Sequence, residues 1–277
     1  MATIATTTPS PLRRRTLRLP LATLAGRRFQ LTTRTPRELF VPLLTPVLFA
    51  LVIAPALKSA LHTSAAYEAF VAVGTIGLLI PLNTMFSGLS VIVDRDSGAY
   101  RELLAAPVPR PLLLVGNLAV ALVVTGLQVI TLIAFAVVRG IDFHPTGAGV
   151  AWFAVTAVLF TVGMYGAAEI LAARVPRQEE YIARVPAIAI VPWFLAGSLF
   201  PISALPAFLG WFARVLPLTH GLALMRYGLL GDRTGLSNIW GMANVTTMAG
   251  LSLAVISVFA ATLLLGSIWV FARSAFR

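Results

Sequence analysis

The stretch that decides the fold runs from residue 69 to residue 138 and reads AFVAVGTIGLLIPLNTMFSGLSVIV, then DRDSGAYRELLAAPVPRP, then LLLVGNLAVALVVTGLQVITLIAFAVV. Each flanking run is apolar over about the 20 residues that a helix needs to cross a bilayer. The charged island between them, 94–111, offers a helix cap at Asp96 or Ser97 and a proline stop at Pro107. The pattern therefore predicts two transmembrane helices joined by a short helix that serves as a docking surface.

Composition indicates a polytopic membrane protein. Hydrophobic residues make up 58% of the 277 residues, charged residues only 11%, and the mean hydropathy is +0.89. The net charge of +11 does not indicate a nucleic-acid partner, because the arginines cluster beside apolar runs, where anionic membrane lipid and topology explain them. Cysteine is absent, which excludes disulfides, a thiolate nucleophile and a Cys-based metal site.

The apolar segments predict an all-α membrane protein with six transmembrane helices. The predicted spans are 39–57, 69–93, 112–138, 150–173, 185–200 and 245–272. Before them, 1–17 is expected to be a disordered cytosolic tail and 18–37 an amphipathic interfacial helix, so that 38–277 forms the membrane domain. Sixteen of the 21 Lys and Arg residues fall on one side of this topology. The positive-inside rule therefore predicts a multi-pass protein of the cell membrane with both termini in the cytosol.

The region before the last span carries an unusual proline pattern. The segment 185–213 is apolar for longer than one span requires, and prolines interrupt it at Pro186, Pro192, Pro201 and Pro206. We expect one span followed by a re-entrant hairpin, 201–230, on the outer side; a kinked span with a long loop is the alternative.

Three hairpin residues are candidates for the substrate path, namely Phe208, Trp211 and Arg226. An arginine is costly in hydrocarbon, by about 2.5–3.5 kcal/mol, so we expect Arg226 to face water or a polar head group.

Few polar groups lie within the predicted spans. Asn83 and Gln128 either line a substrate path or hydrogen-bond neighbouring helices, and the sequence leaves both possibilities open. Glu169 is either functional or paired with Arg174 or Arg177 near the cytosolic end.

No catalytic motif is present. A phosphate-binding P-loop needs Gly-Lys-Ser/Thr, whereas the single lysine, Lys58, follows a leucine. The three histidines, His62, His144 and His220, are far apart in the sequence and are expected to be outer-loop residues. We therefore predict no catalytic residues, no metal site and no cofactor in this chain, and expect ATP and Mg to be bound by a partner subunit.

The island and the residues after it resemble the conserved block of ABC-2-type transporter permeases. The matching residues are Asp96, Ser97, Gly98, Glu102, Leu103, Leu104, Pro107, Arg110 and Gly116, while Asn117 stands where lysine is common. A second block, formed by 200–201, 216–221 and 226–231, is similar to the family's signature between spans five and six. Within this family, the sequence most resembles permeases of the daunorubicin-resistance type.

The resemblance implies an ATP-driven exporter of lipid-like, lipid-linked or amphipathic drug-like cargo, including antibiotics. Its partners would be an ABC ATP-binding subunit and a second permease subunit, identical or paralogous. The residues that would contact the ATPase and couple it to transport are Asp94, Asp96, Ser97, Tyr100, Arg101, Glu102, Leu103, Leu104 and Pro107. A secondary, ion-coupled transporter and a membrane-embedded enzyme are the alternatives.

Overall fold

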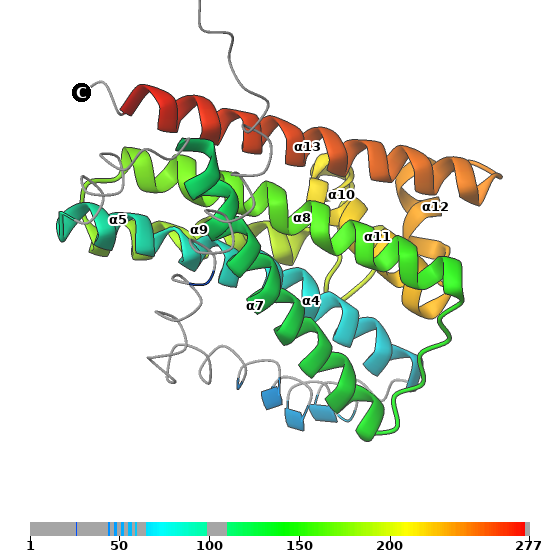
Figure 1. Ribbon diagram of the computed structural model, residues 1–277. Coiled ribbons are helices and arrows are strands. Elements are labelled where there is room, and N and C mark those ends of the chain that lie inside the picture. Colours follow the sequence, from blue (N-terminus) through cyan, green and yellow to red (C-terminus); the bar gives the residue numbers. More distant parts are fainter. Residues whose placement is uncertain are drawn as a thin grey trace, which may run out of the picture.

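The computed structural model describes residues 65–98 and 110–274, together with a few isolated positions between 26 and 59. All regular elements in these ranges are helices, as the sequence predicts (Figure 1). The α-helices are α4 (Ala65–Ser87), α5 (Leu89–Asp96), α7 (Arg110–Val138), α8 (Gly147–Arg174), α9 (Gln178–Leu195), α10 (Ala207–Val215), α11 (Pro217–Leu230), α12 (Thr234–Trp240) and α13 (Val245–Ser274). A short 3-10 helix, Ile202–Ala204, precedes α10.

Several predicted elements fall outside the described residues. They are the tail 1–17, the interfacial helix 18–37 except residue 26, most of the first span 39–57, and the segment 99–109 of the charged island. These elements remain predictions.

Four helical stretches of the described part are long and apolar enough to cross a bilayer. They are Ala66–Asp96, Leu113–Val138, Gly147–Arg174 and Val245–Phe271, and the bent pair α10–α11 makes a fifth if it is counted as one span. These stretches agree with the predicted spans 69–93, 112–138, 150–173 and 245–272 to within a few residues. The predicted span 185–200 is misplaced, because α9 covers Gln178–Leu195 and carries two acidic residues in its first turn.

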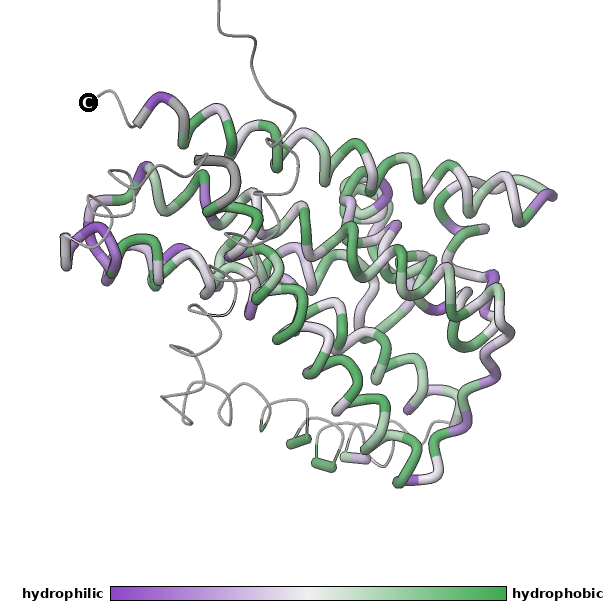
Figure 2. The backbone as a smooth tube through the Cα atoms, viewed as in Figure 1, coloured by the Kyte–Doolittle hydropathy of each residue, from purple (hydrophilic) through white to green (hydrophobic). Residues whose placement is uncertain are grey.

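The long helices form one bundle with two polar ends. In Figure 2 the apolar residues lie along the helices, while polar residues gather where the helices end. One end holds the C-termini of α5, α8 and α13 and the N-terminus of α9, and we call it the Asp96 end (Figure 1). The other holds the α7–α8 loop and the turn between α11 and α12, and we call it the Asp232 end.

The second predicted span is one helical stretch with an interruption at Gly88, whose backbone keeps helical angles (φ −66°, ψ −19°). It divides at Gly88 into α4 and α5, where a Cβ would lie 2.2 Å from the Tyr181 hydroxyl oxygen and 2.9 Å from the carbonyl oxygen of Ala168. Tyr181 of α9 donates its hydroxyl hydrogen to the carbonyl of Met85. This bond satisfies a carbonyl at the end of α4, so α9 holds the break in place. As a result, Asp94 and Asp96 lie on a helix and not in a loop.

Close helix contacts hold α8 against its neighbours. A Cβ at Gly163 would lie 2.6 Å from the Phe259 ring, and one at Gly166 would lie 2.5 Å from the backbone of Leu263 in α13. At the Asp232 end, Gly149 of α8 and Gly228 of α11 approach each other equally closely. Such contacts between small residues are the usual means of packing helices where no water drives association. They join α8, α11 and α13 into one body.

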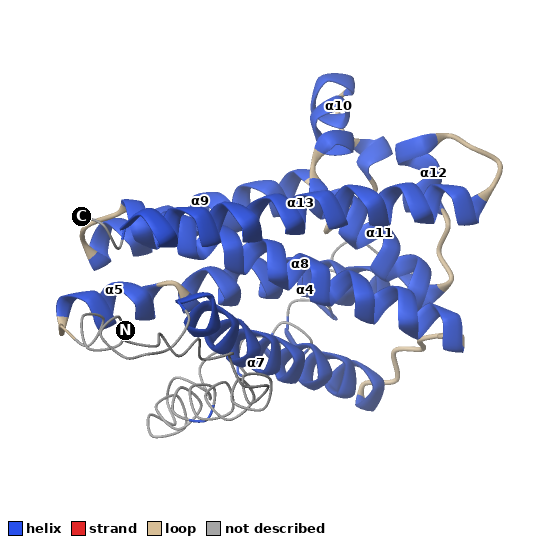
Figure 3. Cartoon of the chain, turned by 45° about the horizontal axis from the view of Figure 1, so that its top comes forward, coloured by secondary structure: helices blue, strands red, loops and turns tan. Residues whose placement is uncertain are grey.

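The predicted hairpin 201–230 is observed as two helices, α10 and α11, that meet at 80° beside Leu216. Pro217 at the first position of α11 sets this corner, because proline starts a helix but cannot continue one. Helix α10 stands off the bundle (Figure 3).

A hydrogen-bonded chain anchors the hairpin to α12 and α13. His220 Nε2 lies 2.9 Å from the Arg214 carbonyl, so this nitrogen donates, and Nδ1 lies 3.2 Å from Ser252 Oγ. Trp240 Nε1 donates to the same Ser252 Oγ at 2.8 Å. The expectation that His220 lies in an outer loop is therefore wrong: it is a buried residue of α11.

Candidate functional site

An arginine clamp joins two segments at the Asp96 end. Arg95 of α5 donates from its guanidinium to the carbonyls of Ala172 at 3.3 Å, Val175 at 3.1 Å and Pro176 at 2.9 Å. These carbonyls lie at the C-terminus of α8, where helix carbonyls lack intrahelical partners and the helix dipole favours a cation. The clamp fixes α5 to the turn that leads from α8 into α9.

The clamp brings charged groups of both segments to one surface, which we call the Asp96 surface. Its members are Asp94, Asp96, Arg174, Arg177, Glu179, Glu180 and Arg184, of which Asp94 and Glu180 are half-buried and the others exposed. Glu180 and Arg184 form an ion pair of 3.6 Å on α9.

Three predicted coupling residues belong to this part of the protein. Asp94 and Asp96 lie on α5, and Ser97 is the C-cap of α5, with its hydroxyl donating to the Asp94 carbonyl at 3.2 Å. The other predicted coupling residues, Tyr100, Arg101, Glu102, Leu103, Leu104 and Pro107, lie outside the described residues. The sequence analysis did not name Arg95 as a site residue. Its position between two candidates, Asp94 and Asp96, could have indicated one.

The two predicted amides of the spans meet inside the bundle. Asn83 of α4 donates from Nδ2 to Oε1 of Gln128 on α7. Gln128 is fully buried and its Nε2 has no hydrogen-bond partner among the described residues. The pair therefore links α4 to α7. Of the two roles that the sequence left open, a substrate path or a hydrogen bond between helices, the structure shows the hydrogen bond.

Glu169 is buried in α8, with 6% of its surface exposed. It accepts a hydrogen bond from the hydroxyl of Tyr165, one helical turn earlier. Tyr165 is a partner that the sequence interpretation did not consider.

The aromatic residues of the hairpin are strongly exposed. Phe208 is 70% exposed, Trp211 62% and Phe212 44%, and the rings of Phe208 and Trp211 both contact Phe212 edge to face. They form an apolar face on α10, the helix that stands off the bundle (Figure 3). Apolar surface of this kind is typical of contact with lipid, cargo or another protein chain.

Arg226 is buried and not exposed to bulk solvent as expected, although it lines a small cavity and its Nε has no hydrogen-bond partner among the described residues. It is 4% exposed and donates to the carbonyls of Gly197 at 2.8 Å, Ser198 at 2.9 Å and Phe70 at 3.3 Å. Its guanidinium carbon lies 3.3 Å from the centre of the Phe70 ring. Arg226 thus connects α11 with α4 and with the chain that follows α9. The sequence reasoning missed this because the accepting carbonyls have no sequence signature.

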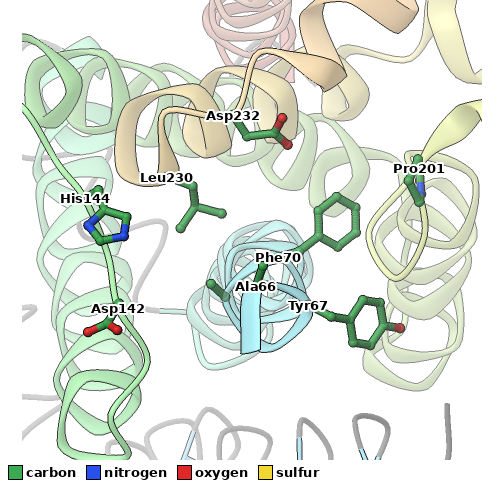
Figure 4. Close-up of a pocket in the computed structure, with 9 residues that line it drawn as sticks. Ala66, Tyr67, Phe70, Asp142, His144, Pro201, Leu230 and Asp232 are labelled. Carbon is green, nitrogen blue, oxygen red and sulfur yellow. The ribbon is translucent and has the colours of Figure 1, made fainter. Parts of the chain in front are cut away.

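A cavity near these residues opens at the Asp232 end and measures about 520 Å³. In Figure 4 the α7–α8 loop, which carries Asp142 and His144, lies on one side of α4, whereas Tyr67 and Phe70 of α4 lie on the other side, toward Pro201, and Asp232 after α11 lies at the top of the view. The loop is held in place because the His144 backbone N–H donates to the Leu229 carbonyl at 3.1 Å.

Asp232 owes its position to the turn that ends α11. Gly231 closes the helix with a positive φ of 67°, and Asp232 Oδ1 accepts the Thr234 N–H at 2.8 Å as α12 begins. This cavity was not predicted from the sequence, since its walls come from four separate segments.

Comparison with known families identifies the class of protein. The model of the ABC-2 type transporter family matches residues 20–230, which is most of the chain. The chain therefore belongs to the ABC-2 type transporter family and is the membrane component of an ABC-type permease. The match ends where α11 ends, so α12 and α13 lie beyond it. Among curated proteins, none matches the chain significantly.

Proposed function

We propose that the chain is the permease subunit of an ATP-driven exporter, powered by a separate ATP-binding subunit that docks at the Asp96 surface. The observation that carries the proposal is the Arg95 clamp, which joins the described part of the charged island, 94–98, to the charged segment 174–184 in one surface. Membership of the ABC-2 type transporter family supports a partner ATPase.

The packing supports a mechanical role for this surface. Helix α5 is bonded to the C-terminus of α8, and α8 packs closely along α13 at Gly163 and Gly166. A push on α5 would therefore move α8 and α13 together rather than bend one helix. Rigid-body movement of this kind is a common way to convert closure of one subunit into opening of another.

The apolar character of the exit side supports a cargo with an apolar part, of the lipid-like, lipid-linked or amphipathic drug type. Phe208, Trp211 and Phe212 present aromatic surface on α10, and we place this helix and the Asp232 end toward the outer side of the plasma membrane. A second copy of the chain, or a paralogue, would complete the transport path. In this proposal the carbonyl-bound Arg226 supports the exit but does not line an open, water-filled one.

The partner requirement gives the first test. The purified chain is expected to show no ATP hydrolysis, while co-expression with the ABC ATP-binding subunit should give a stable complex that hydrolyses ATP. Complex formation is measured by co-purification, with the chain carrying Asp96→Arg and Glu179→Arg as the matched variant, since both residues are exposed on the Asp96 surface. We expect this variant to fold normally and to lose at least about tenfold in affinity for the ATPase, because two attractive or neutral contacts become repulsive. Equal co-purification of parent and variant would move the docking site elsewhere.

The orientation of the bundle gives a second test, which the absence of native cysteine makes direct. Cysteines introduced at Ala148 and Ser237, which are exposed at the Asp232 end, should react with a membrane-impermeant maleimide on intact cells. Cysteines at Ser97 and Glu179 should react only after permeabilisation. The reverse pattern would invert the proposed topology, and with it the proposed outer position of the α10 aromatic face.

A further inference from the structure

Two cavities adjoin at the Asp232 end. The larger, of about 520 Å³, is the one in Figure 4, and the smaller, of about 150 Å³, lies beside it. Phe70, Pro201 and Asp232 line both. The larger volume falls within the range of roughly 300–1,000 Å³ that is usual for small-molecule sites.

The walls of the larger cavity favour a cation. Two carboxylates, Asp142 and Asp232, line it, and no lysine or arginine of the described part does. Tyr67 adds an aromatic ring, which stacks on Phe70 with ring centres 6.3 Å apart, while the Phe70 ring already carries the guanidinium of Arg226. Carboxylates supply charge, and ring faces attract cations that carry apolar groups. An organic ammonium group suits this combination better than a small, strongly hydrated ion. A bound metal ion is not indicated, because the described residues hold no group of three or more His, Asp or Glu side chains arranged to bind one.

The smaller cavity adds an independent observation. Two deeply buried side chains that line it leave polar atoms without hydrogen-bond partners among the described residues: Thr219 Oγ1, on a residue 3% exposed, and Arg226 Nε, on a residue 4% exposed. Arg226 Nε can only donate, so its missing partner is an acceptor. Buried polar atoms of native proteins almost always find a partner in protein, water or ligand.

We propose that the two cavities form one binding site for an organic ammonium group linked to an oxygen acceptor. The ammonium group lies in the larger cavity on the side of Asp232 and Tyr67, and Asp142 on the opposite wall adds negative charge to the same cavity (Figure 4). The oxygen enters the smaller cavity and accepts from Arg226 Nε and Thr219. A free amino alcohol and the ammonium head group of a phospholipid share this chemistry. Binding at the site requires neither ATP nor a partner subunit, so it stands or falls apart from the proposed export function.

The test uses the full chain, purified and placed in lipid nanodiscs of phosphatidylglycerol, and three small probes. Choline carries both the ammonium group and the oxygen, tetramethylammonium lacks the oxygen, and 3,3-dimethylbutanol is the uncharged counterpart of choline. Equilibrium binding should follow the order choline, tetramethylammonium, dimethylbutanol. The first and last should differ by at least about tenfold, and the difference should shrink at high salt.

Variants separate the two halves of the site. Asp142→Asn together with Asp232→Asn should weaken choline binding at least about tenfold; the asparagine amide in place of the Asp232 carboxylate retains an oxygen acceptor for the Thr234 N–H, so the turn is kept. Thr219→Val should weaken choline but leave tetramethylammonium unchanged, and it removes a hydroxyl that makes no hydrogen bond within the described part of the chain. The matched control is Asp96→Asn at the opposite end, which should bind like the parent. Thermal unfolding of each variant checks that the fold is intact.

A second set of nanodiscs identifies the source of the ammonium group. If phosphatidylethanolamine or phosphatidylcholine in the disc suppresses choline binding through the same residues, the natural ligand is a lipid head group. If binding is equal in all lipids, the natural ligand is a free amine; both results support the site.

Equal binding of choline and dimethylbutanol, unchanged binding in the Asp142→Asn, Asp232→Asn variant, or no binding of any cation would overturn the proposal and leave the cavities as water-filled space.

Discussion

Replacing Arg226 with Met is expected to destabilise the chain by about 3 kcal/mol or more, because three buried carbonyls lose a charged donor and each unpaired group costs about 1–3 kcal/mol. The carbonyls belong to Phe70, Gly197 and Ser198, so the loss frees α11 from α4 and from the chain after α9. The measurement is thermal or denaturant unfolding of the purified protein in detergent. Arg226→Lys should be intermediate, since a single ammonium cannot copy the planar fork of a guanidinium.

The control for this experiment is Arg233→Met, which removes an exposed arginine shortly after the end of α11. It should change stability by no more than about 0.5 kcal/mol, the usual range for surface substitutions. An Arg226→Met variant as stable as Arg233→Met would contradict the buried position and the clamp. Gly74→Val offers an independent check and should also destabilise, because a Cβ at Gly74 would lie 2.1 Å from the Ser198 carbonyl oxygen and 3.2 Å from Arg226 Nη2.

Replacing Arg95 with Ala is expected to separate ATP hydrolysis from transport. The reason is mechanical: without the clamp, α5 keeps the packing of the buried Ile92 but loses its hydrogen bonds to the C-terminus of α8, so it can bend at Gly88 instead of moving α8. We expect the amount of cargo moved per ATP hydrolysed to fall at least about tenfold in reconstituted vesicles, which corresponds to roughly 1.4 kcal/mol of coupling free energy. The side chain of Arg95 is 36% exposed, so the effect on unfolding should be small, within about 1 kcal/mol.

The matched control for Arg95 is Arg139→Ala, an exposed arginine at the opposite end of the bundle. It should leave both transport and ATP hydrolysis at parental values. A parental ratio of transport to hydrolysis in Arg95→Ala would show that α5 transmits no movement through α8. If both activities fell together while the complex stayed intact, the clamp would act on docking rather than on transmission.

The class of protein and most of its membrane helices follow from the sequence alone. The long apolar runs fix where α7, α8 and α13 lie, because no other structure satisfies the backbone of some 25 consecutive apolar residues in a bilayer. The blocks 94–117 and 200–231 carry the family resemblance. The match to the family model confirms that the chain belongs to the ABC-2 type transporter family. The proline pattern predicted an interrupted segment after the fifth span, and α10 and α11 form one; Pro186 and Pro192, however, lie inside α9, and the corner is at Pro217, which the pattern did not include.

The details that make a site were decided by tertiary structure. The interruption at Gly88 inside the second span was not predicted, because the residue that packs against it, Tyr181, lies some 90 residues later in the sequence. The start of α9 was placed too late because its first turn is charged, and a charged segment is typical of a loop. In the structure this turn lies at the polar Asp96 end, so its charges stay outside the apolar part of the bundle. Arg226 looked like a residue in need of water, yet backbone carbonyls supply its hydrogen bonds.

The cavity at the Asp232 end shows the same limit most clearly. Asp142 and His144 come from one loop, Tyr67 and Phe70 from α4, and Asp232 from the turn after α11. Helical periodicity and hydropathy are local properties, so they locate each segment but carry no information on which loops meet. The sequence therefore determined that this chain is a helical membrane permease, and only the packing of its helices decided which polar groups are buried, bonded or left facing a cavity.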